Sequence, residues 1–193
     1  MKASPIVNIK NFHLTVVNHH ATAPLSACLS TTQDPDGFPG IGNLWPEQGG
    51  VVAGYMPSQE GARAYYLIVP INDAAESEKL TWGGYGTDSK ATSDWDGLAN
   101  TQALADSADE HPAAEFCRNV KIGNFNDFYL PARREASLIT ATVPHLFKPG
   151  WHWTSTQYSA NGAFVQYFSD GRQDSHHKGN AYRVRAVRRF LIN

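Results

Sequence analysis

The chain has 193 residues and a formal net charge of −2, a length that suits one compact domain able to bury its own core. This charge balance does not favour long-range attraction to nucleic acid or anionic lipid, and no run of about eighteen apolar residues could span a bilayer. Charged residues make up 18% of the chain, below the roughly 25% of average globular proteins. Polar contacts therefore depend on Asn, Gln, Ser, Thr and His, a composition that suits the recognition of sugars and proteins.

The N-terminal part of the chain differs in composition from the rest. Residues 6–20 alternate apolar and polar side chains and predict one strand. Residues 21–50 are rich in Pro, Gly, Ser and Asp and predict a linker. We therefore expect an attachment and assembly segment over residues 1–45, followed by a folded domain over residues 46–193.

The first residues do not predict export. In "MKASPIVNIKNFHLTVV" a single early lysine precedes a short, interrupted apolar stretch, which is not typical of a secretory signal. We expect that the protein either works where it is made or leaves the cell by assembly or lysis, without inserting into a membrane.

Two strands joined by a turn are predicted after the linker. Residues 51–56 and 64–71 are rich in β-branched and aromatic side chains. Residues 57–63 between them contain Pro, Ser and Gly, which are typical of a turn. This order predicts a hairpin, and a long loop with several glycines follows over residues 80–97.

Three segments in the middle of the chain show helical spacing. Pro112 and Pro131 stand where the first turn of a helix favours proline, and Cys117 lies on an apolar face behind Pro112. The residues that recur at helical spacing are Leu98, Ala99, Gln102, Ala103 and Ala105, then Ala113, Phe116, Cys117 and Val120, then Ala132, Ala136 and Ile139.

The last part of the chain returns to strand patterns. Residues 163–172 alternate before an Asp-Gly turn, and residues 181–190 alternate Tyr182 and Val184 with arginines. Strands, then helices, then strands with long loops predict an α+β domain rather than repeated βαβ units.

Four arginines crowd the C-terminus. Arg183, Arg185, Arg188 and Arg189 could bind phosphate, but alternation on a terminal strand more often produces a solvated or carboxylate-paired face. No aromatic residues are interleaved among them as in a nucleic-acid platform. We expect no nucleic-acid partner.

No catalytic arrangement is evident in the sequence. Cys28 and Cys117 cannot form a dense disulfide framework, and we interpret both as buried thiols while leaving open whether they pair. No Gly-x-Ser-x-Gly elbow occurs, so we expect no enzyme.

The histidines and acids do not follow a metal-binding pattern. His176 and His177 are adjacent and point apart in an extended chain, and no zinc-binding spacing occurs. The acids Asp88, Asp94 and Asp96 are scattered in a long loop without a calcium-binding run. We expect no metal and no cofactor, with bound calcium as the remaining alternative.

Eight stretches line up in chain order with one family. They are "GGVVAGYM" from Gly49, "AYYLIVP" from Ala64, "LTWGGYGT" from Leu80, "GLANTQAL" from Gly97, "PAAEFC" from Pro112, "NDFYLPARREASLI" from Asn126, "WHWTSTQYSANGAFVQYFSDGR" from Trp151 and "YRVRAVRRF" from Tyr182. Together they resemble the Lcl C-terminal domain family of bacterial surface proteins and phage tail proteins. The resemblance does not extend to residues 1–45.

The resemblance implies a C-type-lectin-like fold with two helices packed on a twisted antiparallel sheet with long loops. It implies a binding module without known catalytic activity, and it carries over no catalytic residue. The chain departs from the family at Thr154, where relatives often have Ser, and at Phe128, where they often have Trp. These changes do not affect the expected fold, but the loops that vary in such a fold set the ligand.

We predict a recognition surface on three loops that carry aromatic, amide, imidazole and guanidinium groups. Trp151 and Trp153 stand two residues apart and share one face of an extended chain, where they could stack on a sugar or an apolar partner. The alternative is that one or both fill the core beneath the loops. The candidate ligand-binding residues are Trp95, Trp151, His152, Trp153, Gln157, Tyr158, Arg172, His176, His177 and Asn180.

These features predict a non-enzymatic phage tail or baseplate component, part of the virion, that binds a bacterial surface glycan or protein. We expect its N-terminal segment to contact other tail proteins, and a homo-oligomer, most plausibly a trimer, to present several weak sites at once. The alternatives are a bacterial surface adhesin and an enzyme on a lectin-like fold.

Overall fold

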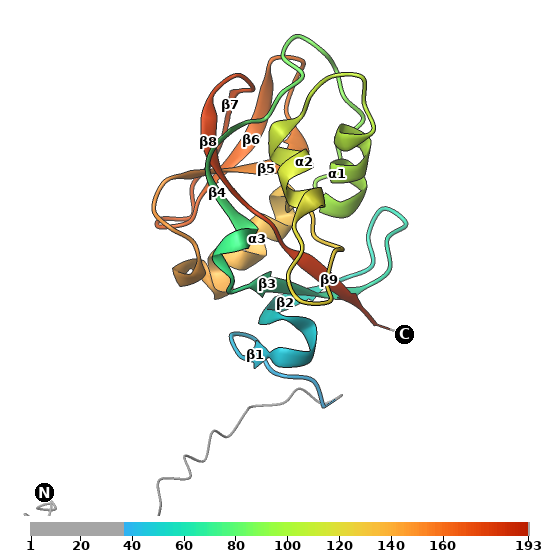
Figure 1. The fold of residues 1–193 in the computed structure, drawn as a ribbon, viewed down its shortest axis with the longest axis vertical. Helices are drawn as coiled ribbons and strands as arrows, with labels where there is room; N and C mark the ends of the chain where they lie inside the picture. The colour runs from blue at the N-terminus through green and yellow to red at the C-terminus, as the bar shows by residue number, and fades with distance from the viewer. Residues whose placement is uncertain (1–36, 193) are drawn as a thin grey trace, which may run out of the picture. The chain divides into compact units, whose positions relative to one another are not determined.

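The computed structural model describes residues 37–192, and these residues belong to one compact unit. They form two β-sheets and three α-helices (Figure 1), so the predicted α+β class is confirmed. The predicted strand over residues 6–20 and the attachment segment as far as residue 36 lie outside the described residues, as does Cys28.

The first sheet has four strands in the order β1-β2-β3-β9, all antiparallel. The strands are β1 (Leu44–Trp45), β2 (Gly50–Met56), β3 (Tyr65–Pro70) and β9 (Arg188–Leu191). The predicted hairpin is confirmed as β2 and β3. Alternate side chains of these strands face opposite sides, so that Leu67 and Val69 enter one core cluster while Ile68 enters another.

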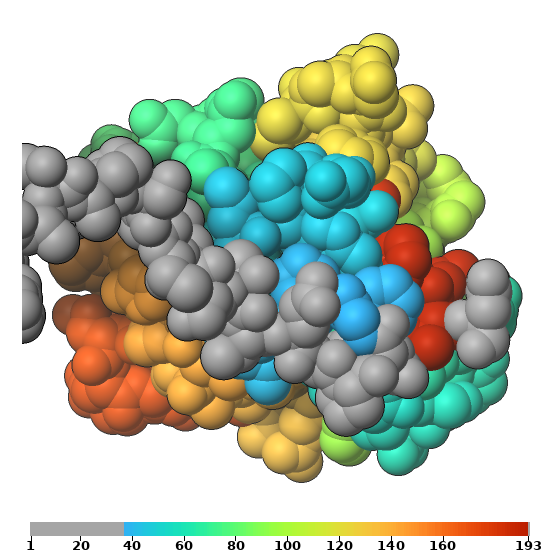
Figure 2. Space-filling view, turned by 90° about the horizontal axis from the view of Figure 1, so that it is seen from below, coloured from blue at the N-terminus to red at the C-terminus, as the bar shows by residue number. Residues whose placement is uncertain are grey.

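Residues before the predicted domain boundary belong to this sheet. Trp45 is buried and pairs with Gly50, and the Phe38 ring lies 5.2 Å from the Trp45 ring and 5.6 Å from that of Phe190. Figure 2 shows the first described residues, in blue, beside the C-terminal segment, in red. The linker composition indicated turns correctly, but it could not indicate that the few apolar residues within it pack on β3 and β9.

The second sheet has five strands in the order β4-β8-β5-β6-β7. The strands are β4 (Glu76–Thr81), β5 (Trp151–Gln157), β6 (Gly162–Tyr167), β7 (Gln173–His177) and β8 (Ala181–Arg185). β5 and β8 are parallel at His152 and Arg183, and the other neighbours are antiparallel. Residues 173–177, expected as part of a variable loop, instead pair along β6, because the Asp170-Gly171 turn returns the chain directly beside that strand.

The three α-helices occupy the segments with helical spacing. They are α1 (Gly97–Ala105), α2 (Pro112–Asn119) and α3 (Arg133–Thr142). The inward face of α1 is not the one formed by Leu98 and the alanines: Leu98 is exposed, whereas Asn100 and Thr101 are buried. Their side chains are buried because they bond the backbone of Ser93 and Leu130, a tertiary use of polar groups that periodicity does not reveal.

Two main core clusters form around the helices. One joins α1 and α2 to the second sheet and contains Leu104, Cys117, Trp153 and Val165. The other joins α3 to the first sheet and contains Leu67 and Ala136, among others. Cys117 is fully buried as predicted, and burial raises the pKa of its thiol well above the ordinary value.

The four C-terminal arginines pair with carboxylates, as expected. Arg183 and Arg185 contact Glu76, while Arg188 contacts Asp127 and Arg189 contacts Asp96. These pairs hold the segment where the chain crosses from β8 in the second sheet to β9 in the first (Figure 1). No helix within residues 37–192 is long and apolar enough to cross a membrane.

Candidate recognition surface

Four aromatic side chains from four strands meet on one face of the second sheet. Trp151 of β5 is the register partner of Tyr167 of β6, and their ring centroids are 5.2 Å apart. The His176 ring of β7 lies 4.8 Å from Trp151 and 5.1 Å from Tyr182 of β8. All four side chains are half-buried, so each ring keeps part of its surface open to solvent.

Two polar residues lie at the edge of these rings. The Arg172 guanidinium lies 5.7 Å from the centre of the Trp151 ring and 5.4 Å from that of Tyr167, and an ion pair with Asp170 holds it there at 2.8 Å. Asn180 donates to the Tyr182 hydroxyl at 3.2 Å. We call this set the aromatic face; it comprises Trp151, Tyr167, Arg172, His176, Asn180 and Tyr182.

The Tyr182 hydroxyl connects the polar groups of the aromatic face. It accepts a hydrogen bond from Asn180 Nδ2. It also lies 2.8 Å from His176 Nδ1, to which it can donate a hydrogen bond. Asp174 stands 3.8 Å from His176 Nε2 and is itself mostly exposed. Half-open rings give apolar contact area and the polar edge gives directional bonds, which is the combination that binding a sugar ring or a protein side chain requires.

Two of the predicted ligand-binding residues are buried instead. Trp153 is 1% exposed and donates from Nε1 to the carbonyl of Leu80 at 2.9 Å, so it fills the core as the alternative interpretation proposed. His152 is 2% exposed and contacts the rings of Phe147 and Phe168 on the opposite side of β5. Neither side chain can touch a ligand at the surface.

The Gln157 side chain is bonded to a neighbouring loop and is not free to bind a ligand. Its Oε1 accepts from Lys178 Nζ at 2.8 Å and from the backbone of Ser89 at 2.8 Å, and its Nε2 donates to Asp88. Lys178 is fully buried, and its ammonium also donates to the carbonyls of Gly84 and Thr87. Sequence reasoning missed Lys178, since a lysine in a polar stretch normally predicts an exposed side chain.

The remaining predicted residues lie apart from the aromatic face. Tyr158 is 62% exposed and packs on Phe164, while His177 stacks on Tyr85 with 4.2 Å between ring centroids. Trp95 packs against the core cluster under α3. The structure therefore brings together Trp151, Arg172, His176 and Asn180 from the predicted set and adds Tyr167 and Tyr182.

The described part of the chain, residues 37–192, contains no group of three or more His, Cys, Asp or Glu side chains placed to hold a metal ion. Asp88 bonds Gln157, and Asp94 and Asp96 pair with arginines. The acids of the long loop thus have structural partners on neighbouring elements.

No protein-family model matches the sequence, and a search of curated proteins gives no match either. The resemblance to the Lcl C-terminal domain family therefore rests on its eight stretches alone.

Proposed function

We propose that this is a non-enzymatic recognition protein that binds a bacterial surface receptor through the aromatic face. The observation that carries the proposal is the convergence of Trp151, Tyr167, His176 and Tyr182 from four strands into adjoining half-open rings. A rigid sheet holds these rings in place, which reduces the entropy lost on binding. The receptor is a glycan, whose ring stacks on the aromatic side chains, or a protein that inserts an apolar side chain there.

The setting of Cys117 argues against an enzyme that uses this thiol as its nucleophile. A cysteine nucleophile needs an open, electropositive setting that favours the thiolate. Cys117 is fully buried in the α1–α2 core, and burial raises the pKa of its thiol. An enzyme on a lectin-like fold is therefore the weaker alternative.

The family resemblance supports the biological setting. It covers phage tail proteins and bacterial surface proteins, and two curled antiparallel-rich sheets with packed helices are compatible with the C-type-lectin-like fold that it implies. We propose a virion component of the tail or baseplate, in which the segment before Phe38 contacts other tail proteins, because Phe38 and Trp45 pack within the folded domain. A bacterial surface adhesin is the alternative setting.

Binding of the full-length protein to a glycan array and to a panel of bacterial strains tests the proposal. Strains that bind the protein would then be treated with periodate, which destroys sugar rings, or with protease. Loss after periodate identifies a glycan receptor, and loss after protease identifies a protein receptor. Absence of binding to every glycan and strain would contradict a recognition function.

We also propose a homo-oligomer, most plausibly a trimer, because several copies of a weak site raise the overall affinity of attachment. Light scattering on the full-length protein at micromolar concentration measures this directly. The expected mass is three times that of one chain, and a monomer would contradict the proposal.

A further inference from the structure

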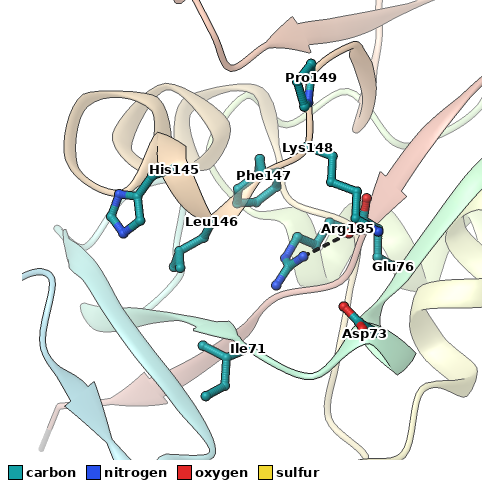
Figure 3. A pocket seen from close by; sticks show the side chains of 9 residues that line it. All are labelled: Ile71, Asp73, Glu76, His145, Leu146, Phe147, Lys148, Pro149 and Arg185. Atoms are coloured by element: carbon teal, nitrogen blue, oxygen red, sulfur yellow. Dashed lines mark hydrogen bonds and ion pairs between the residues drawn. The ribbon is translucent and has the colours of Figure 1, made fainter.

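A cavity opens beside the segment that joins the two sheets (Figure 3), and none of the residues that line it belongs to the aromatic face. Its volume is about 430 Å³, within the range of small-molecule sites in proteins. The segment that follows β3 and leads into β4 forms one wall, the segment that leads into β5 forms the other, and Arg185 at the end of β8 lies at its base. Sites at junctions between packed layers commonly bind ligands.

The base of the cavity is a buried charge cluster. The Glu76 side chain is 3% exposed and faces three cations: Arg183 at 3.2 Å, Arg185 at 3.0 Å and Lys148 at 3.4 Å. Glu78 contacts only Arg183, at 3.5 Å, from the surface. Glu76 thus contacts all three cations. Arg185 and Lys148 each carry more N–H donors than Glu76 can accept from.

Arg185 is incompletely satisfied. A guanidinium carries five N–H groups, and within residues 37–192 Nη1 donates to Glu76 and Nη2 to the carbonyl of Pro70, while Nε is buried without a partner. Its side chain is 6% exposed. Because Nε has almost no accessible surface, the donors that remain for a ligand are the second protons of Nη1 and Nη2.

The walls of the cavity differ in chemistry. Lys148 is half-exposed on one side. On the other, the Asp73 carboxylate is exposed, and its negative charge acts on the Arg185 guanidinium. Ile71 is 57% exposed at the mouth, and Leu146 and Pro149 add apolar surface. The cavity therefore presents cations, an acceptor and an apolar wall to the same small volume.

We infer that this cavity binds a hydroxylated carboxylate the size of one sugar ring, such as a sugar acid. The ligand carboxylate contacts Lys148 and the free N–H groups of Arg185, its hydroxyl groups donate to Asp73, and its C–H face lies against Ile71. A simple anion would contact the cations but would face the Asp73 carboxylate without donating a hydrogen bond to it. A neutral sugar would offer Lys148 and Arg185 only uncharged acceptors, which form weaker hydrogen bonds than a carboxylate does.

Titration calorimetry on the full-length protein tests this inference, with glucuronate, glucose and acetate as the probes. We expect binding of glucuronate and none of glucose or acetate at the same concentration. Lys148→Gln should weaken glucuronate binding about tenfold, as for loss of a hydrogen bond to a charged group, while Lys79→Gln, at an exposed lysine on β4, should leave it unchanged. Both lysines are exposed, so neither change should lower the melting temperature.

Asp73→Ala separates a sugar acid from a simple anion. If hydroxyl groups donate to Asp73, the variant binds glucuronate more weakly, whereas stronger binding would show that Asp73 only repels the anion and would overturn the inference. Equal binding of glucose and glucuronate, or no effect of Lys148→Gln, would also overturn it. Trp151→Ala should leave glucuronate binding intact, so this site and the aromatic face can fail independently.

Discussion

At the scale of single residues, the surroundings of a buried polar side chain set its charge state. His152 donates from Nδ1 to the carbonyl of Gly150 at 3.1 Å, and its Nε2 is buried without a partner among residues 37–192. Burial lowers the pKa of His152 from the ordinary 6.5 to about 4. The neutral imidazole therefore fits the fold, and the charged form does not.

His152 makes stability depend on pH. Because the folded pKa lies below the unfolded one, the unfolded chain takes up a proton between pH 6.5 and about pH 4 that the folded chain does not hold. Its contribution is complete above pH 6.5 and falls as the pH falls towards 4, by about 3 kcal/mol. His152→Phe, which keeps the contacts with Phe147 and Phe168, should remove this loss. Urea unfolding at pH 7 and pH 4 measures the free energy of unfolding lost by the variant and by the parent. If both proteins lose the same amount between these pH values, His152 does not have this role.

Lys178 is a buried cation, held by three oxygen acceptors and by the Trp82 ring, whose centre lies 4.7 Å from Nζ. Lys178→Met would remove the donor to the Thr87 carbonyl and one of the two donors to the Gly84 carbonyl and to Gln157 Oε1. We expect the free energy of unfolding to drop by about 2 to 3 kcal/mol, as measured by urea denaturation. Lys90→Met, at an exposed lysine, is the matched control; similar stability of the two variants would refute the role of Lys178.

At the scale of elements, patterns with strong local causes were predictable. The β2–β3 hairpin, the three helices and the Asp170-Gly171 turn follow from β-branched runs, helical spacing and turn chemistry. β7 was not predictable, because "QDSHH" lacks the apolar alternation of a strand and pairs only through the position of β6. The prediction of the buried face of α1 was wrong for a related reason, because Asn100 and Thr101 are buried through hydrogen bonds to distant loops.

The start of the folded domain gives an element-scale prediction. A chain of residues 46–193 lacks β1 and the Phe38–Trp45 contacts, whereas a chain of residues 37–193 keeps both. Loss of a buried tryptophan and its neighbours should lower the unfolding free energy by about 3 kcal/mol or more. Thermal melts of the two chains measure this, and equal melting temperatures would show that the fold begins after Trp45.

At the scale of the whole molecule, the candidate site was only partly predictable. Trp151, Arg172, His176 and Asn180 were identified by their chemistry, but their convergence with Tyr167 and Tyr182 depends on the register of four strands, which periodicity alone does not set. His152 and Trp153 share the same stretch as Trp151, yet both are buried. Chemistry therefore identified the stretch, and the sheet decides which of its side chains reach the surface.

The Arg172→Ala variant tests the central claim most directly, in an assay of binding to the strain or glycan that the parent protein recognises. Arg118→Ala is a matched control, because each arginine is exposed and makes one surface ion pair, Arg172 with Asp170 and Arg118 with Asp106. We predict that Arg172→Ala weakens binding about fivefold, the effect of roughly one kilocalorie at a contact residue, and that Arg118→Ala does not. Equal binding by both variants, with unchanged melting temperatures, would contradict recognition through the aromatic face.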